Sequence, residues 1–111
     1  HLLELCEGSD VSAVIDYQKI PVFGEAIEYM RQGAVPGGTF RNWSSFSDKL
    51  ILPDQELRNI LCDPQTSGGL LISVDEDGSE EVEALLKGEN LISHSFGYLK
   101  QPGQEVILIN Q

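Results

Sequence analysis

The sequence predicts an α+β fold, a layered α/β sandwich in which helices pack against a mixed sheet. Two observations lead to this prediction. Apolar residues recur at helical spacing in several short stretches, and the last third of the chain alternates apolar runs and a helical stretch in a β-α-β-β order. With 111 residues, of which 41% are hydrophobic, the chain is long enough for one core, so we expect a single domain over residues 1–111.

The chain opens with the pattern of a helix followed by a strand. Residues 1–7 have a helical apolar pattern that ends at Gly8-Ser9-Asp10, and residues 11–16 form a β-branched run typical of a strand. The first residue is His1 rather than methionine, and the apolar pattern begins at once. This favours a chain that starts inside an element of a larger protein, with a processed N-terminus as the alternative.

A second helical pattern comes next, followed by a stretch without a period. Apolar residues recur at helical spacing between Phe23 and Met30, and Gly33 is placed to end that helix. Residues 34–50 hold no period, so we expect a long loop there. Long loops in compact domains are usually functional or packed down. The three aromatic residues of this loop indicate packing against this domain or against a neighbour outside the sequence.

The middle of the chain predicts a short helix and a buried strand. The helix begins near Pro53-Asp54, and it must stop by Cys62 because Pro64 disfavours the α region for the residue before it. Residues 69–74 are a nearly unbroken apolar run, which predicts a central strand covered on both faces.

The last third predicts a helix and a hairpin. Ser79 is expected to cap a helix over residues 79–88, with two glutamates in its first turn. Residues 91–99 and 106–109 are expected to be strands, joined as a hairpin by the Pro-Gly turn at 101–104.

The charge balance excludes several kinds of partner. Seven Lys and Arg residues face 18 Asp and Glu residues, giving a net charge of −11, and the cations are scattered. Nucleic acid and anionic membranes need clustered cations, so we expect neither as a partner. No apolar run reaches the length of about 20 residues that spans a bilayer, and we expect a cytoplasmic protein. Cys6 and Cys62 lack a metal or redox spacing; two buried thiols are expected, with a disulfide left open.

One candidate site is the polar loop at 63–69, which runs from a helix end into an apolar run. Asp63 is placed to hold a divalent cation, and the hydroxyls of Thr66 and Ser67 are placed to bond a ligand. Equally, Asp63 could form a turn, and Gly68 and Gly69 could serve tight packing. A loop that leaves a helix C-terminus faces the negative end of the dipole, so it is poorly built as a phosphate cradle by itself.

A second candidate site is the glycine pair in Val-Pro-Gly-Gly-Thr. Gly37 and Gly38 could expose backbone amides to a ligand, with Thr39 and Asn42 beside them and Arg41 supplying charge. A plain turn followed by a solvated arginine is the alternative. The sequence holds no complete catalytic constellation and no metal motif, so we assign no catalytic residue and no metal ligand.

The two candidate loops resemble a known family. Val-Pro-Gly-Gly-Thr-Phe-Arg-Asn at 35–42 and Leu-Cys-Asp-Pro-Gln-Thr-Ser-Gly-Gly-Leu-Leu-Ile at 61–72 are similar to two signatures of selenophosphate synthetase, also called selenide, water dikinase. The opening at 1–5 resembles the helix that in this family follows a Thr-Asp-Val-Thr-Gly-Phe-Gly segment, which the sequence lacks. The resemblance covers essentially the whole chain in order and spacing.

The resemblance implies an ATP- and magnesium-dependent parent enzyme that makes selenophosphate from selenide, related to aminoimidazole ribonucleotide synthetase and homodimeric. This chain would be the larger, distal part of its C-terminal domain, lacking the N-terminal domain that carries the catalytic cysteine or selenocysteine, its paired lysine and the ATP loop. Alone it would be inactive and hold no tightly bound cofactor. What carries over is cleft-edging residues: Gly37, Gly38, Thr39, Asn42, Asp63, Thr66, Ser67, Gly68 and Gly69.

Two alternatives remain from the sequence. The chain could be a non-catalytic module that binds a small regulatory ligand, because β-α-β-β segments with glycine loops also serve in that way. It could also belong to a sister enzyme of the same ATP-using superfamily, although the wording at 63–69 resembles selenophosphate synthetase in particular.

Overall fold

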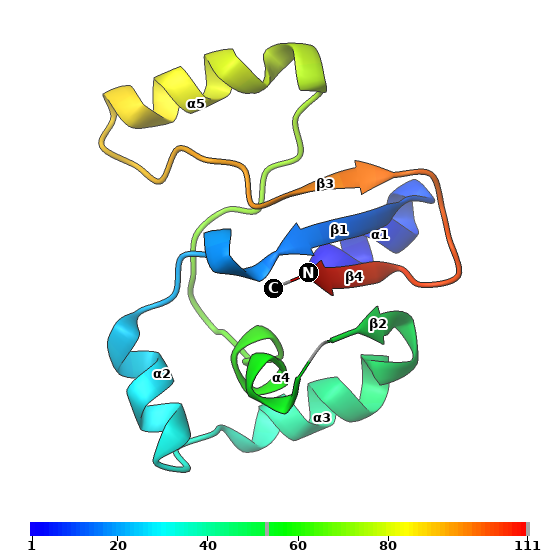
Figure 1. Ribbon diagram of the computed structural model, residues 1–111, viewed down its shortest axis with the longest axis vertical. Coiled ribbons are helices and arrows are strands. Elements are labelled where there is room, and N and C mark those ends of the chain that lie inside the picture. The colour runs from blue at the N-terminus through cyan, green and yellow to red at the C-terminus, as the bar shows by residue number, and fades with distance from the viewer. Residues whose placement is uncertain (53, 111) are drawn as a thin grey trace.

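A four-stranded mixed sheet lies at the centre of the chain (Figure 1). The computed structural model describes residues 1–52 and 54–110. Strand order is β2-β4-β1-β3, with β4 parallel to both of its neighbours and β3 antiparallel to β1. The expected α+β class is therefore confirmed. The strands are β1 (Ser12–Asp16), β2 (Leu50–Ile51), β3 (Gly97–Lys100) and β4 (Ile107–Asn110).

Within the described residues, five α-helices and three short 3-10 turns surround this sheet. In Figure 1, α1 lies behind the sheet, α3 and α4 lie together near β2, and α5 stands apart beyond β3. The helices are α1 (Leu2–Ser9), α2 (Gly24–Arg31), α3 (Gly37–Phe46), α4 (Gln55–Leu61) and α5 (Ser79–Gly88), and the 3-10 turns are η1 (Tyr17–Lys19), η2 (Ser47–Lys49) and η3 (Glu76–Gly78). None of the described helices has the length and apolar character needed to cross a membrane.

The core lies between α1 and one face of the sheet. Helix α1 ends where Asp10 adopts a left-handed conformation (φ 52°) and its amide donates to the carbonyls of Cys6 and Glu7, a common helix ending. The alternation of strand side chains then sends every second residue of β1 toward α1. Buried together are Leu3, Cys6, Ala13, Ile15, Leu57, Ile107 and Ile109.

A buried serine fixes the connection from β3 to β4. The Ser12 hydroxyl donates to the carbonyl of Glu105 at 2.9 Å and accepts from the amide of Gly103 at 2.9 Å. Only 2% of Ser12 is exposed, so both bonds lie away from competing water, where such bonds are strongest. These bonds attach the β3–β4 connection to the start of β1.

The expected hairpin of β3 and β4 is wrong, because β1 lies between these two strands. A Pro-Gly turn predicts that the chain reverses direction, but it does not predict that the two strands it joins are neighbours in the sheet.

The stretch at 34–50, expected to be a loop, contains helix α3. Pro36 precedes its first turn with an extended backbone (φ −59°, ψ 140°), and the helix starts at two glycines. Its inward face is mixed: Thr39 is buried, while Asn42 and Trp43 are half-buried. A face built from a threonine and an asparagine shows no apolar period, and glycines are poor helix formers, so the pattern concealed the helix.

Residues 69–74 do not form the expected central strand. The segment has no ladder partner in the described structure, and Leu70 is 90% exposed. The interior positions of the sheet are occupied by β1 and β4, which come from the two ends of the sequence. An apolar run alone could not reveal that competition. The predicted strand at 91–99 is likewise shorter, beginning only at Gly97.

The other helix predictions agree with the structure in most details. Helix α4 starts after Asp54, whose carboxylate accepts from the amides of Glu56 and Leu57. Pro53, the other expected starter, lies outside the described residues. Helix α5 spans the expected residues, but Ser79 is not its cap; the Ser79 hydroxyl donates to the carbonyl of Glu76 at 2.9 Å.

Candidate functional site

The two glycine-containing motifs meet in space. A methyl group added to Gly38 would lie 2.6 Å from Cγ and 2.7 Å from Cβ of Pro64. The first turn of α3 therefore packs directly on the start of the loop at 63–69, at a distance that only a residue without a side chain allows. Residue 38 is buried, in keeping with this close approach.

An asparagine ties the same two segments together one turn later. Asn42 donates its side-chain amide to the carbonyl of Cys62 at 3.0 Å. Cys62 is the last residue of the turn that ends α4, and carbonyls at a helix C-terminus lack an intrahelical partner. Asn42 thus supplies a donor that the helix end needs, and its role in the structure is to hold α3 against α4.

The N-terminus of α3 brings positive potential to this junction. The amides of Gly37 and Gly38 have no hydrogen-bond partner within the described part of the chain, and the first amides of a helix carry the positive end of its dipole. Arg41 adds charge beside this turn, because one guanidinium nitrogen lies 3.5 Å from where a Gly38 methyl would be. The start of the loop at 63–69 therefore lies near the positive end of the α3 dipole as well as the negative end of the α4 dipole.

The loop at 63–69 is exposed over its whole length. Among the residues the structure describes, the side chains of Asp63, Thr66 and Ser67 make no hydrogen bond or ion pair, and neither do the amides from Thr66 to Gly69. Only the start of the loop is ordered by bonds: the amide of Gln65 donates to the carbonyl of Asp63 at 2.8 Å. The loop thus presents free donors and one free carboxylate to solvent.

The two glycines of this loop differ in their surroundings. A methyl on Gly68 would approach the side-chain amide of Gln65 at 2.5 Å, but that amide is the end of a flexible side chain. A methyl on Gly69 would meet nothing within 4 Å. Packing inside this chain therefore gives no reason for a glycine at position 69.

Thr39 is a fully buried candidate residue with a polar side chain. It is 0% exposed, and its hydroxyl oxygen has no hydrogen-bond partner in the described structure. A buried hydroxyl without a partner costs about 1–3 kcal/mol. Thr39 sits in the first turn of α3, beside the Gly38–Pro64 contact, so this cost is located at the candidate site.

Neither cysteine has the environment of a nucleophile. Burial raises the pKa of the Cys6 thiol, and burial also raises the pKa of the Cys62 thiol, an effect that nearby Arg58 partly offsets. Both thiols are free and buried, which confirms the expectation of unpaired cysteines. A thiol with a raised pKa stays protonated near neutral pH and is a poor nucleophile.

The structure thus joins α3 to the start of the loop at 63–69 through Gly38 and Asn42, and among the described residues no hydrogen bond ties positions 66–69 to α3. Sequence reasoning missed one contributor to this junction, Pro64 as the packing partner of Gly38. Arg41, which was expected from the sequence to supply charge, lies beside the first turn of α3. No cluster of three or more His, Cys, Asp or Glu residues suited to a metal ion occurs among the described residues.

The chain is similar to known proteins over nearly its whole length. Residues 1–109 match the family model described as AIR synthase related protein, C-terminal domain. The chain is 46% identical over 112 residues to a selenide, water dikinase of Aeromonas hydrophila subsp. hydrophila, covering 100% of this chain and 32% of that protein. A selenide, water dikinase of Aeromonas salmonicida is 46% identical over 100 residues, covering 90% and 29%.

A third relative, the selenide, water dikinase of Shewanella sp. strain MR-4, is 40% identical over 102 residues, covering 92% of this chain and 29% of its own. The chain therefore spans about a third of the length of the curated relatives that it matches. The resemblance of the two motifs is confirmed by this agreement over the whole sequence. The chain belongs to the AIR synthase related protein family, as a C-terminal domain of that family.

Proposed function

We propose that this chain is the distal part of the C-terminal domain of an ATP-dependent selenophosphate synthetase that acts in the cytoplasm as a homodimer. In the complete enzyme, the junction of α3 with the loop at 63–69 would form one wall of the cleft that holds ATP and selenide. The observation that carries this proposal is the meeting of the two motifs through Gly38 and Pro64, which leaves free amides on both sides of one junction.

The chemistry of the junction suits a phosphate chain that carries a divalent cation. Arg41 and the first amides of α3 offer positive charge and donors, and the amides from Thr66 to Gly69 add neutral donors. Asp63 can give one carboxylate oxygen to a magnesium ion, which prefers oxygen ligands and keeps several waters. The net charge of −11 disfavours a bare polyphosphate, so the cation would offset the acidic field. When bound, magnesium-ATP supplies the phosphoryl group that is transferred.

The reactive groups would belong to the part of the relatives that this chain does not span. Cys6 and Cys62 are buried thiols with raised pKa, so neither is proposed as the nucleophile. We therefore propose that the chain alone binds no cofactor tightly and has no activity. Release of AMP and phosphate from ATP by the isolated chain, when given selenide, would refute this part of the proposal.

A substitution at Gly69 tests the wall without disturbing the fold. Gly69→Val adds a side chain where nothing lies within 4 Å, and Gly24→Val, at the start of α2, does the same away from the junction. In the complete enzyme we expect Gly69→Val to raise the KM for ATP or abolish turnover, and Gly24→Val to leave both constants unchanged. Unchanged kinetics for a folded Gly69→Val enzyme would rule out a ligand against this loop.

Arg41 provides a second test with a different readout. If its guanidinium bonds a phosphate, Arg41→Gln loses a charge-assisted hydrogen bond of about 1.5–3 kcal/mol, which is roughly a tenfold or greater rise in the Kd for magnesium-ATP. Nucleotide binding to the complete enzyme, measured by calorimetry, gives this value directly. Arg31→Gln is the control, because Arg31 lies on α2 and its guanidinium pairs with Glu56 of α4 at 2.7 Å.

A further inference from the structure

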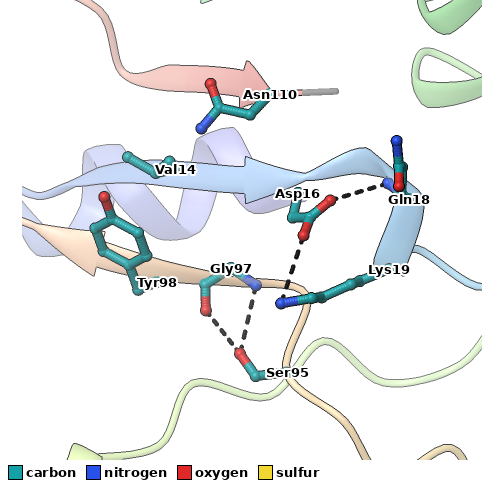
Figure 2. Close-up of a pocket in the computed structure, with 8 residues that line it drawn as sticks. All are labelled: Val14, Asp16, Gln18, Lys19, Ser95, Gly97, Tyr98 and Asn110. Atoms are coloured by element: carbon teal, nitrogen blue, oxygen red, sulfur yellow. Dashed lines mark hydrogen bonds and ion pairs between the residues drawn. The ribbon is translucent and has the colours of Figure 1, made fainter.

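A cavity lies away from both motifs, on the sheet face opposite α1. Figure 2 shows it over the carboxyl ends of β1 and β4 and the start of β3. It is open and has a volume of about 560 Å³, and its principal lining residues are Val14, Asp16, Gln18, Lys19, Tyr98 and Asn110. None of the candidate residues at the α3 junction contributes to it, so the inference below is independent of the proposed function.

One end of the cavity carries two opposite charges side by side. Asp16 Oδ2 lies 3.4 Å from Lys19 Nζ, with side chains 41% and 57% exposed, respectively. The other carboxylate oxygen accepts from the amide of Gln18 at 3.2 Å, which fixes the carboxylate at the end of β1. An exposed ion pair of this kind contributes little to stability, so a ligand can replace it at little cost.

Apolar and polar groups share the rest of the cavity. Val14 forms a buried floor, and Figure 2 shows the Tyr98 ring beside it and Asn110 on the neighbouring strand. Tyr98 is 63% exposed. In the part of the chain that the structure describes, the side-chain amides of Asn110 and Gln18 have no hydrogen-bond partner, so they are free to bind a ligand.

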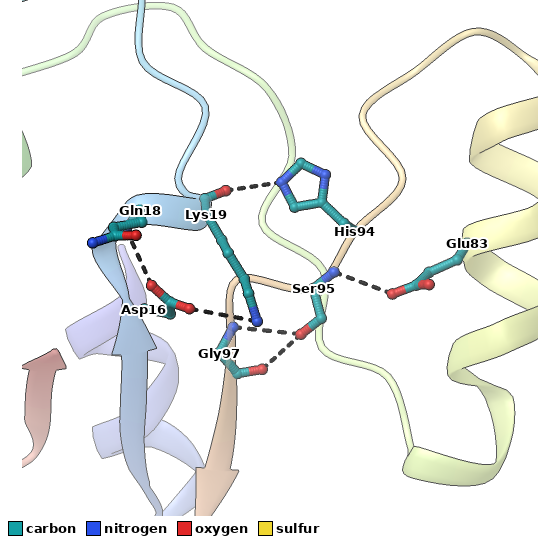
Figure 3. Close-up of polar contacts among 7 residues, drawn as sticks. All are labelled: Asp16, Gln18, Lys19, Glu83, His94, Ser95 and Gly97. Carbon is teal, nitrogen blue, oxygen red and sulfur yellow. Dashed lines mark hydrogen bonds and ion pairs between the residues drawn. The ribbon is translucent and has the colours of Figure 1, made fainter. Parts of the chain in front are cut away.

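Hydrogen bonds from two other elements hold the remaining wall. His94 Nε2 donates to the carbonyl of Lys19 at 3.0 Å, and Glu83 of α5 accepts from the amide of Ser95 at 3.1 Å (Figure 3). The hydroxyl of Ser95 donates to the carbonyl of Gly97 at 2.8 Å. The segment before β3 is thus tied both to η1 and to α5.

We propose that this cavity binds a small zwitterion, an α-amino acid with an apolar or aromatic side chain. Its ammonium group replaces Lys19 as the partner of Asp16, its carboxylate bonds the Lys19 ammonium, and its side chain covers Val14 beside the Tyr98 ring. A zwitterion has no net charge, so the net charge of −11 that repels free anions does not oppose it. Small-molecule sites likewise combine apolar contact surface with polar groups that fix the orientation of the ligand.

Three probes of matched shape test the proposal on the 15N-labelled chain. L-phenylalanine carries both charges, phenethylamine lacks the carboxylate and 3-phenylpropionate lacks the amine. We expect L-phenylalanine to shift the amide resonances of Gly97 and Tyr98 with a Kd at least about tenfold lower than either analogue. The proposal is wrong if the three probes bind equally, if shifts centre on residues 70–74 as for general apolar adsorption, or if millimolar L-phenylalanine causes no shift.

Two substitutions then assign the charges. Asp16→Asn keeps an oxygen for the Gln18 amide; it should weaken L-phenylalanine about tenfold and leave 3-phenylpropionate unchanged. Lys19→Gln should weaken L-phenylalanine and 3-phenylpropionate but not phenethylamine. Lys87→Gln, on α5 outside the cavity, is the control. Equal losses for all probes in both variants would contradict the assigned contacts, and the probe comparison on the unmodified chain decides the case if a variant fails to fold.

Discussion

The close approach of Gly38 to Pro64 makes a quantitative prediction about stability. An alanine methyl at position 38 would lie 2.6 Å and 2.7 Å from two ring carbons of Pro64, whereas ordinary contacts begin at 3.4 Å. The proline ring cannot swing away as the end of a long side chain can. Overpacking of this kind costs about 1–3 kcal/mol.

The neighbouring glycine supplies the matched control. A methyl on Gly37 has Arg41 as its nearest neighbour, at 3.9 Å. Both glycines lie in the first turn of α3, so replacing either with alanine gains a similar helix propensity, at most about 1 kcal/mol. That gain cancels in the comparison. We therefore expect Gly38→Ala to be less stable than Gly37→Ala by about 1–3 kcal/mol.

Urea unfolding followed by circular dichroism measures this difference. With a slope of about 1–3 kcal/mol per molar urea for a small protein, the two midpoints should differ by about 1 M. In a double-mutant cycle, Pro64→Gly should recover most of the Gly38→Ala loss, because it removes both contacting carbons. Equal midpoints for Gly38→Ala and Gly37→Ala would refute the contact, and with it the joining of the two motifs.

Three further predictions concern the bonds and packing around the sheet. Asn42→Ala should lower the free energy of unfolding by about 1 kcal/mol because the Cys62 carbonyl loses its donor; an unchanged urea midpoint would contradict that role. Gly97→Ala should destabilise the chain by more than Gly38→Ala does, because its methyl would collide with the backbone carbonyl of Val14. A thermal midpoint equal to that of the unmodified chain would contradict this prediction. The free energy of unfolding should also fall as pH rises above about 9. Burial raises the pKa of Cys6 in the folded state, so the thiol of the unfolded chain loses its proton first and the unfolded state is favoured. Urea unfolding at several pH values should show this decrease, and Cys6→Ala should make it smaller.

The sequence predicted local structure best where a single residue type favours the start or the end of a helix. Asp54 begins α4 and Gly33, with φ 92°, follows the end of α2, and both were foreseen from the preferences of those residue types. Strand β1 was foreseen from its β-branched run. These features depend on neighbours within a few residues, so no knowledge of the tertiary fold was needed.

What could not be predicted depended on partners distant in sequence. The run at 69–74 has the composition of a central strand, but β4 takes the place between β1 and β2. The face of α3 is polar because Asn42 serves the end of another helix. The candidate residues were found individually from their types and their resemblance to a family, whereas their meeting at one junction follows from the contact of Gly38 with Pro64, which no local pattern contains.

The position of β4 has a consequence for how the chain acquires its structure during synthesis. Among the described residues, β2 pairs with β4 alone, and β1 uses one of its two edges for β4. Half of the sheet therefore cannot form until residues 107–110 have left the ribosome. Until then, the apolar faces of β1 and α1 have little to cover them, and such intermediates are prone to aggregate. We therefore expect this topology to make the chain depend on chaperones during translation.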